Sequence, residues 1–201
     1  MGAAGKDLDL HSQRVRDFIA LFKARGVDID PTLTTFEGMF TARPGELDPN
    51  QAPIADRMPP QVRRGFYGGG LPVPAGMDQR YRDSFGEMMA MVKAMYDAGV
   101  PIVAGTDNGP VGFQLHRELE LYVKAGIPAP QVLRIATFGA AHVMHHDSEL
   151  GSIAAGKLAD VVLVDGDPTT NICDVRKTVL VVKNGVEYEP KELYAVLGVT
   201  P

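Results

Sequence analysis

The chain has 201 residues, a formal net charge of −5, 45% hydrophobic residues and 22% charged residues. This balance is typical of a globular domain and excludes a disordered tail or a fibrous repeat. The acidic charge argues against a nucleic-acid partner, and no apolar run reaches the roughly 20 residues of a membrane span. The single cysteine, Cys173, excludes an intrachain disulfide. The first ten residues lack the apolar region of a secretory signal, so a cytoplasmic location is the default expectation.

The first part of the chain predicts a helix followed by a strand. Apolar residues recur at helical spacing after Ser12, and Gly26 is suited to end the helix. Residues 27–36, VDIDPTLTTF, are rich in β-branched side chains and predict a strand. The sequence therefore begins with one unit of an α/β fold.

A second unit of the same kind follows. Its helix is expected to begin at Ser84, where Glu87 completes a capping box, and to end at Gly99. Residues 100–105, VPIVAG, then predict a strand buried on both faces, which is typical of parallel sheets. Repetition of the unit favours an α/β fold class.

The last part of the chain has a different pattern. Two further helices are expected, over residues 114–125 and 128–145. After Gly151 the sequence predicts a strand and then a hairpin, because Asn184-Gly185 stands between alternating apolar residues. A short helix ends the chain. We therefore expect two domains, residues 1–148 and 149–201.

A long segment, residues 41–83, separates the two units and is expected to be a Pro/Gly-rich loop. It contains arginines and no lysine, and arginine is suited to bidentate carboxylate binding. Arg63 and Arg64 are the arginines that we select as substrate-binding candidates. The alternative is that these are surface arginines paired with the acidic residues of the same segment.

Asp107 is the first candidate for catalysis. It follows the buried strand of residues 100–105, and active sites of parallel α/β folds lie at the carboxyl ends of the strands. A carboxylate there can bind a divalent metal and transfer a proton. The alternative is that Asp107 only turns the chain, since Asp-Asn-Gly is a good turn sequence.

The histidines and one glycine-rich segment carry weaker signals. His116 lies nine residues after Asp107 and either contacts substrate or belongs to an exposed, charged helix face. His142 and His146 are expected to be structural or exposed at a helix end. Residues 151–158, GSIAAGKL, have Leu158 where a phosphate-binding loop has Ser or Thr directly after its lysine. We therefore expect Lys157 in a turn before a strand.

Four segments resemble, in this order, the C-terminal half of the amidohydrolase superfamily, in its imidazolonepropionase-like and prolidase-like branch: PIVAGTDNG, ATFGAAHVM, LGSIAAGKLADVVLVDGDP and VLVVKNGVEY. The resemblance extends over about residues 10–188. It implies the last two β/α units of a (β/α)8 TIM-type barrel, followed by part of a small β-sandwich composite domain. It also implies a metal-dependent hydrolase of carbon–nitrogen bonds in amides, lactams or dipeptide-like substrates.

The resemblance gives Asp107 a role, because the family aspartate after the eighth barrel strand binds metal and shuttles a proton. Asn108 beside it becomes a candidate for orienting the aspartate and contacting substrate. The other family ligands, beginning with a His-x-His after the first strand, are missing from this sequence. A catalytic zinc usually needs three protein ligands.

We therefore expect a C-terminal portion of a longer hydrolase that is inactive alone. A divalent metal, with zinc as the first expectation, would be bound by the whole protein and not by this chain. The expected partners are a small-molecule or peptide-like substrate and either the N-terminal half or a second copy of the chain. The alternative is a non-catalytic remnant or a half-barrel that pairs with a partner chain.

Overall fold

The computed structural model describes residues 4–107, 109–110 and 112–200. Its elements in chain order are η1 (Gly5–Asp7), α1 (Gln13–Arg25), α2 (Leu33–Thr41), η2 (Ala52–Arg57), α3 (Pro60–Gly65), α4 (Asp78–Asp97), α5 (Phe113–Lys124), α6 (Ala129–Arg134), the π-helical turn η3 (Ile135–Gly139), α7 (Ala140–Val143), β1 (Val161–Val164), η4 (Ile172–Arg176), β2 (Thr178–Lys183), β3 (Val186–Tyr188) and α8 (Pro190–Leu197). Within these described residues, no helix combines the length and apolar character that crossing a membrane requires.

The predicted bounds of α1 are confirmed. The Ser12 hydroxyl accepts a hydrogen bond from the Val15 amide at 3.3 Å, which caps the first turn. Gly26 closes the helix in the left-handed conformation, with φ 60°. The buried face of α1 packs on Met95 and Val100 from the second unit. Local capping signals therefore set both ends of this helix.

The two predicted strands of the first part meet in a single parallel bridge between Ile29 and Ile102. The Ile29 amide donates to the Pro101 carbonyl and the Val103 amide donates to the Ile29 carbonyl, each at 2.9 Å. The parallel arrangement expected from the buried segment of residues 100–105 is present, and the molecule is an α/β structure.

The prediction of a strand over residues 27–36 is wrong beyond that bridge, because α2 begins at Leu33. The buried Glu118 carboxylate accepts the Leu33 and Thr34 amides, both at 2.8 Å, and so satisfies two amides of the first helical turn. Leu33 and Phe40 then pack in the main core. These long-range contacts outweigh the β propensity of the threonines.

The expected start of the second helix at Ser84 is also wrong, since α4 begins six residues earlier. Ser84 is buried inside the helix, where its hydroxyl donates to the Arg80 carbonyl at 2.9 Å and accepts the Lys6 amide at 3.0 Å. The segment of residues 41–83 is therefore not a loop throughout. It contains η2, α3 and the first turn of α4.

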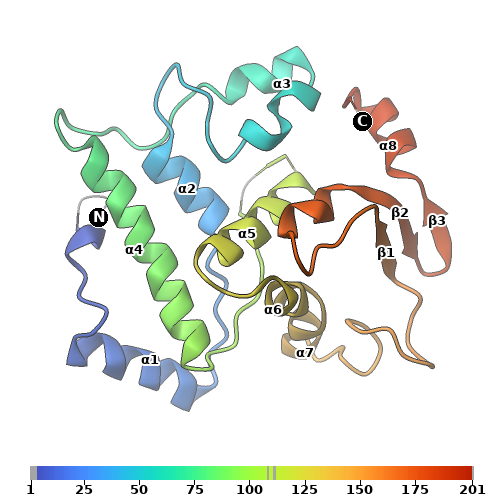
Figure 1. Ribbon diagram of the computed structural model, residues 1–201, viewed down its shortest axis with the longest axis horizontal. Helices are drawn as coiled ribbons and strands as arrows, with labels where there is room; N and C mark the ends of the chain where they lie inside the picture. Colours follow the sequence, from blue (N-terminus) through green and yellow to red (C-terminus); the bar gives the residue numbers. More distant parts are fainter. Residues whose placement is uncertain (1–3, 108, 111, 201) are drawn as a thin grey trace.

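The hydrophobic core lies mainly among α2, α4, α5 and α6 (Figure 1). Its largest completely buried side chain is Tyr122, whose hydroxyl donates to the Val103 carbonyl at 2.8 Å. A second, smaller core joins the segment after α2 to the start of α5 and the last residues of the chain. It contains Ile54, Ala55, Met58, Phe66, Phe113 and Val199.

The predicted hairpin is confirmed. The three-stranded sheet has the order β1-β2-β3, and both pairs of strands are antiparallel. Asn184 and Gly185 have φ values of 50° and 76°, as a two-residue turn between such strands requires. Figure 1 shows the sheet at the opposite end of the molecule from α1 and α4, with α5, α6 and α7 between them.

Candidate active site

Asp107 follows the Ile102 bridge, and its carboxylate is exposed. Its backbone is left-handed, with φ 44°. The Thr35 hydroxyl shares its one hydrogen between the Thr106 carbonyl at 2.8 Å and the Asp107 carbonyl at 3.0 Å, and the Thr34 hydroxyl donates to the Thr106 carbonyl at 3.1 Å. The first turn of α2 therefore fixes the backbone that presents the carboxylate. Asn108, the neighbouring candidate, lies outside the described residues.

Asp30 is a second carboxylate at the same end of the parallel pair, and the sequence reasoning missed it. Its Oδ1 accepts the Gly105 amide at 2.9 Å. A β-carbon on Gly105 would lie 2.1 Å from Asp30 Oδ2, so this approach requires glycine. The position could have been found, because Asp30 directly follows the bridged Ile29 and carboxyl ends of parallel strands share an edge.

His116 lies on α5, where it is half-buried and not exposed. Burial, followed by the nearby Arg176 guanidinium, lowers the pKa of His116 to about 4, so its imidazole is neutral at pH 7. Its Nδ1 atom is buried and has no hydrogen-bond partner among the described residues. His116 faces a cavity of about 830 Å³ whose lining does not include Asp107.

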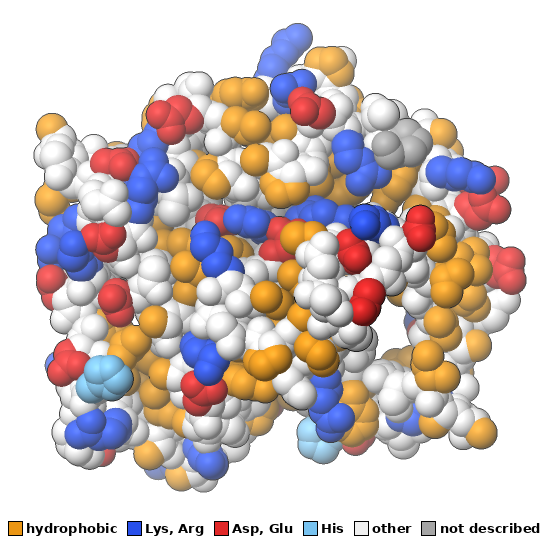
Figure 2. Space-filling view, in the orientation of Figure 1, with side chains coloured by type: hydrophobic (Ala, Val, Ile, Leu, Met, Phe, Trp, Pro, Cys, Tyr) orange, Lys and Arg blue, Asp and Glu red, His pale blue; other side chains and the backbone are white. Residues whose placement is uncertain are grey.

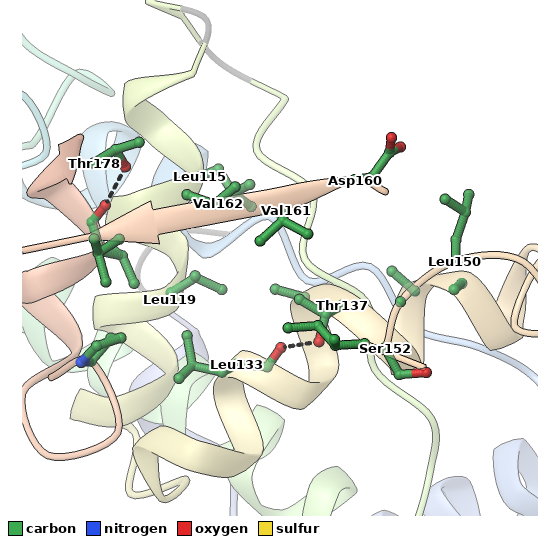
Figure 3. A pocket seen from close by; sticks show the side chains of 18 of the residues that line it. Leu115, Leu119, Leu133, Thr137, Leu150, Ser152, Asp160, Val161, Val162 and Thr178 are labelled. Carbon is green, nitrogen blue, oxygen red and sulfur yellow. Dashed lines mark hydrogen bonds between the residues drawn. The ribbon is translucent and has the colours of Figure 1, made fainter. Parts of the chain in front are cut away.

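This cavity lies between the helices α5–α7 and strand β1 (Figure 3). Leu119, Leu133 and Val161 are among the apolar side chains that line it. The hydroxyl of Thr137 is already used, since it donates to the Leu133 carbonyl at 2.7 Å. The lining is mainly apolar, with His116, His146 and Asp160 among its few titratable side chains.

The arginine candidates lie on α3. Arg63 pairs with Asp56 at 2.8 Å, and Arg64 is exposed. In the same segment Arg43 and Arg82 both pair with Asp78, as the surface-pair alternative expects. Figure 2 shows the same mixture, with Lys and Arg side chains beside Asp and Glu side chains over this face. The ion pair of Arg63 is therefore with Asp56 of η2 and not with Asp107.

Charged side chains of α5 form a buried network that the alternating sequence HRELELYV did not reveal. Arg117 donates through Nε and Nη2 to Glu37 at 2.8 and 2.7 Å, and through Nη1 to Glu120 at 2.9 Å. Arg176 donates to the other oxygen of Glu120 at 2.6 Å. These pairs join α2, α5 and η4, so their role is structural. Their partners are distant in sequence and carry no local signal.

The remaining histidines and Lys157 lie as expected. His142 and His146 are exposed, and their Nδ1 atoms contact Asp147 and Glu149 at 2.9 and 3.4 Å. The Lys157 ammonium donates to the Leu150 carbonyl, the Ser152 hydroxyl and the Asp147 carbonyl. Strand β1 follows instead of a helix, so this segment is a turn and not a phosphate loop.

The described residues do not by themselves fit a catalytic metal. No three His, Cys, Asp or Glu side chains converge anywhere in this part of the chain. A catalytic zinc takes three protein ligands, and Asp107 supplies one carboxylate. Within residues 4–107, 109–110 and 112–200, Asp107 is therefore not part of a group of three such side chains.

The sequence of the chain is similar to the sequences of several curated enzymes. A 5-methylthioadenosine/S-adenosylhomocysteine deaminase of Desulfovibrio desulfuricans is 39% identical over 85 residues, which are 37% of this chain and 19% of the relative. An imidazolonepropionase of Bdellovibrio bacteriovorus is 34% identical over 80 residues, which are 37% of this chain and 19% of the relative. The chain thus matches about a fifth of the length of these curated relatives.

The fold is similar to that of a Xaa-Pro dipeptidase with bound methionine, with a TM-score of 0.62 and 24% identity. This likeness covers 92% of the chain and 38% of the dipeptidase. The sequence model of the amidohydrolase family matches residues 75–187, which include Asp107, α5–α7 and the sheet as far as β3. Since this match covers more than half of its 201 residues, the chain belongs to the amidohydrolase family.

Proposed function

We propose that the whole protein hydrolyses a carbon–nitrogen bond of a small-molecule or dipeptide-like substrate. The observation that carries the proposal is the family match, which includes Asp107 at the end of the parallel pair. The matched relatives are named as deaminases and imidazolonepropionases, and the dipeptidase has a similar fold. The non-catalytic alternative has no comparable support.

Asp107 is the residue to which we assign the proton transfer. Its exposed carboxylate takes a proton from the attacking water and returns it to the leaving nitrogen. The hydrogen bonds from Thr34 and Thr35 hold the backbone from which this carboxylate projects. The family is generally metal-dependent. We propose Asp107 as one ligand of a divalent ion, zinc first, with the remaining ligands outside the described residues.

We further propose that the chain is the C-terminal portion of a longer hydrolase. Residues 1–148 would form two β/α units of a (β/α)8 barrel, and residues 149–201 part of a β-sandwich. The coverage of 38% of the dipeptidase supports this, as does the single parallel bridge. Strand β1 is an edge of the sheet, and its Val162 and Leu163 are 58% and 56% exposed. The rest of the protein, or a second copy, would cover them.

The test compares turnover of amide, lactam and Xaa-Pro dipeptide substrates by the 201-residue chain and by the longer protein. We expect no turnover by the chain alone. In the longer protein, Asp107→Asn should lower kcat by about 10²–10⁴-fold. The matched control is Asp56→Asn, whose carboxylate is 88% exposed and pairs only with Arg63 among the described residues. Metal-dependent turnover by the chain alone, or full activity of Asp107→Asn, would contradict the proposal.

A further inference from the structure

The last described residues of the chain pack on a distant part of the fold, residues 47–66, here named the covering segment. The Tyr194 ring of α8 stacks on the Phe113 ring at 5.8 Å and an interplanar angle of 27°. The Arg57 guanidinium lies over both rings, at 4.9 Å from Tyr194 and 5.6 Å from Phe113. Cation–π contacts of this kind stabilise the arrangement of the three side chains. Figure 1 shows α8 beside the α3 region, although they lie far apart in sequence.

Two hydrogen bonds reinforce this contact, one between backbone groups and one from the Arg57 side chain. The Thr200 amide donates to the Arg57 carbonyl at 2.8 Å, and Arg57 Nε donates to the Thr200 carbonyl at 2.9 Å. Val199 is 7% exposed and packs with Ile54 and Met58 in the second core. Residues 194–200 are therefore held to the covering segment by polar bonds and by apolar burial together.

The covering segment in turn contacts the turn that carries Asp107. Gln51 donates to the Gly109 carbonyl at 3.4 Å and accepts from Gln114 at 2.7 Å, and both glutamines are at most 4% exposed. The buried Asn50 donates to the Thr34 carbonyl at 2.8 Å, and Thr34 itself bonds to Thr106. Buried polar bonds of this type fix geometry, because breaking one leaves an unsatisfied group.

We propose that residues 194–200 act as a strap that holds the covering segment against the Asp107 turn. Arg57 and Tyr194 are then positioning residues that act on the turn through Gln51. Release of the strap would loosen the turn while α1, α4 and the sheet stay folded. An effect of residues 194–200 on catalysis rests on the proposed function, whereas their effect on the Asp107 turn does not.

Hydrogen-exchange mass spectrometry on the 201-residue chain tests the strap. In Tyr194→Ala, exchange should become about tenfold faster in residues 47–66 and in a peptide that contains Gly109 but not Phe113, because the Phe113 ring contacts Tyr194 directly. Exchange in α1 and α4 should not change. Tyr194→Phe keeps the ring and should match the unaltered chain, and Val196→Ala is the control because Val196 is 86% exposed.

A second variant tests the route through Gln51. In Gln51→Ala, the further change Tyr194→Ala should accelerate exchange in the covering segment but no longer in the Gly109 peptide. Unchanged exchange in residues 47–66, or an equal acceleration over the whole chain, would overturn the proposal. Because no activity is measured, either result leaves the role of Asp107 as a separate question.

Discussion

Acid should destabilise this fold through His116. The pKa of its imidazole is lowered to about 4, from an ordinary value of 6.5, chiefly by burial against the cavity and then by Arg176. The folded state therefore prefers the neutral ring. The resulting stability is fully present above pH 6.5, declines progressively as the pH falls below 6.5, and is lost by about pH 4. This difference in pKa corresponds to at most about 3.4 kcal/mol. Since the side chain is partly exposed, we expect a loss of about 2 kcal/mol.

The perturbation is His116→Leu, which removes the titrating group and places an apolar side chain beside Leu115 and Leu119 in the cavity lining. Urea unfolding, followed by circular dichroism at pH 7.5 and pH 4.5, gives the free energy of unfolding of each chain. The unaltered chain should lose about 2 kcal/mol more than the variant between these two pH values. His11→Leu is the control, because His11 is exposed.

Equal losses in the unaltered chain and in His116→Leu would refute the reasoning. That result would mean that His116 is solvated in solution and that other groups set the acid sensitivity. An equal effect of His11→Leu would also contradict the assignment to His116, because it would show that removing any histidine has this consequence.

Three further predictions concern the framework around the site. Glu37→Gln removes the bidentate partner of Arg117 and should lower the free energy of unfolding, measured in urea, by about 3 kcal/mol. Adding Arg117→Met should restore part of this loss. If the losses of the two single variants simply add in the double variant, the prediction is contradicted. Gly70→Ala should lower Tm by several degrees, because its β-carbon would lie 2.3 Å from a backbone carbonyl, whereas Gly65→Ala has open space and should leave Tm unchanged. Lys157→Met should lower Tm through three lost hydrogen bonds, and titration with ATP should give no binding before or after the change.

The elements that sequence reasoning located correctly are those whose ends are set by nearby residues. Ser12 and Gly26 bound α1, and Asn184 with Gly185 turns the hairpin. The failures have long-range causes. Residues 33–41 become a helix because Glu118, far along the chain, caps it. Local capping residues and turn residues can be predicted from the sequence, whereas a cap supplied by a distant side chain cannot.

The residues of the candidate site also differ in whether a local sequence signal predicts them. The position of Asp107 follows from a buried strand and a turn, and the same rule would have found Asp30. The half-buried state of His116 could not be read from its charged neighbours. Two of those neighbours, Arg117 and Glu120, are half-buried because Glu37 pairs with Arg117 and Arg176 pairs with Glu120 from other segments.

Metal content of the purified 201-residue chain tests the central claim most directly, namely that Asp107 is one part of a metal site completed elsewhere. The measurement is plasma emission after gel filtration, with Asp107→Asn in parallel. We predict far less than one equivalent of zinc or manganese per chain, because the described residues bring no three ligands together. Nearly one equivalent, lost in Asp107→Asn, would contradict the account and show that this chain builds the site alone.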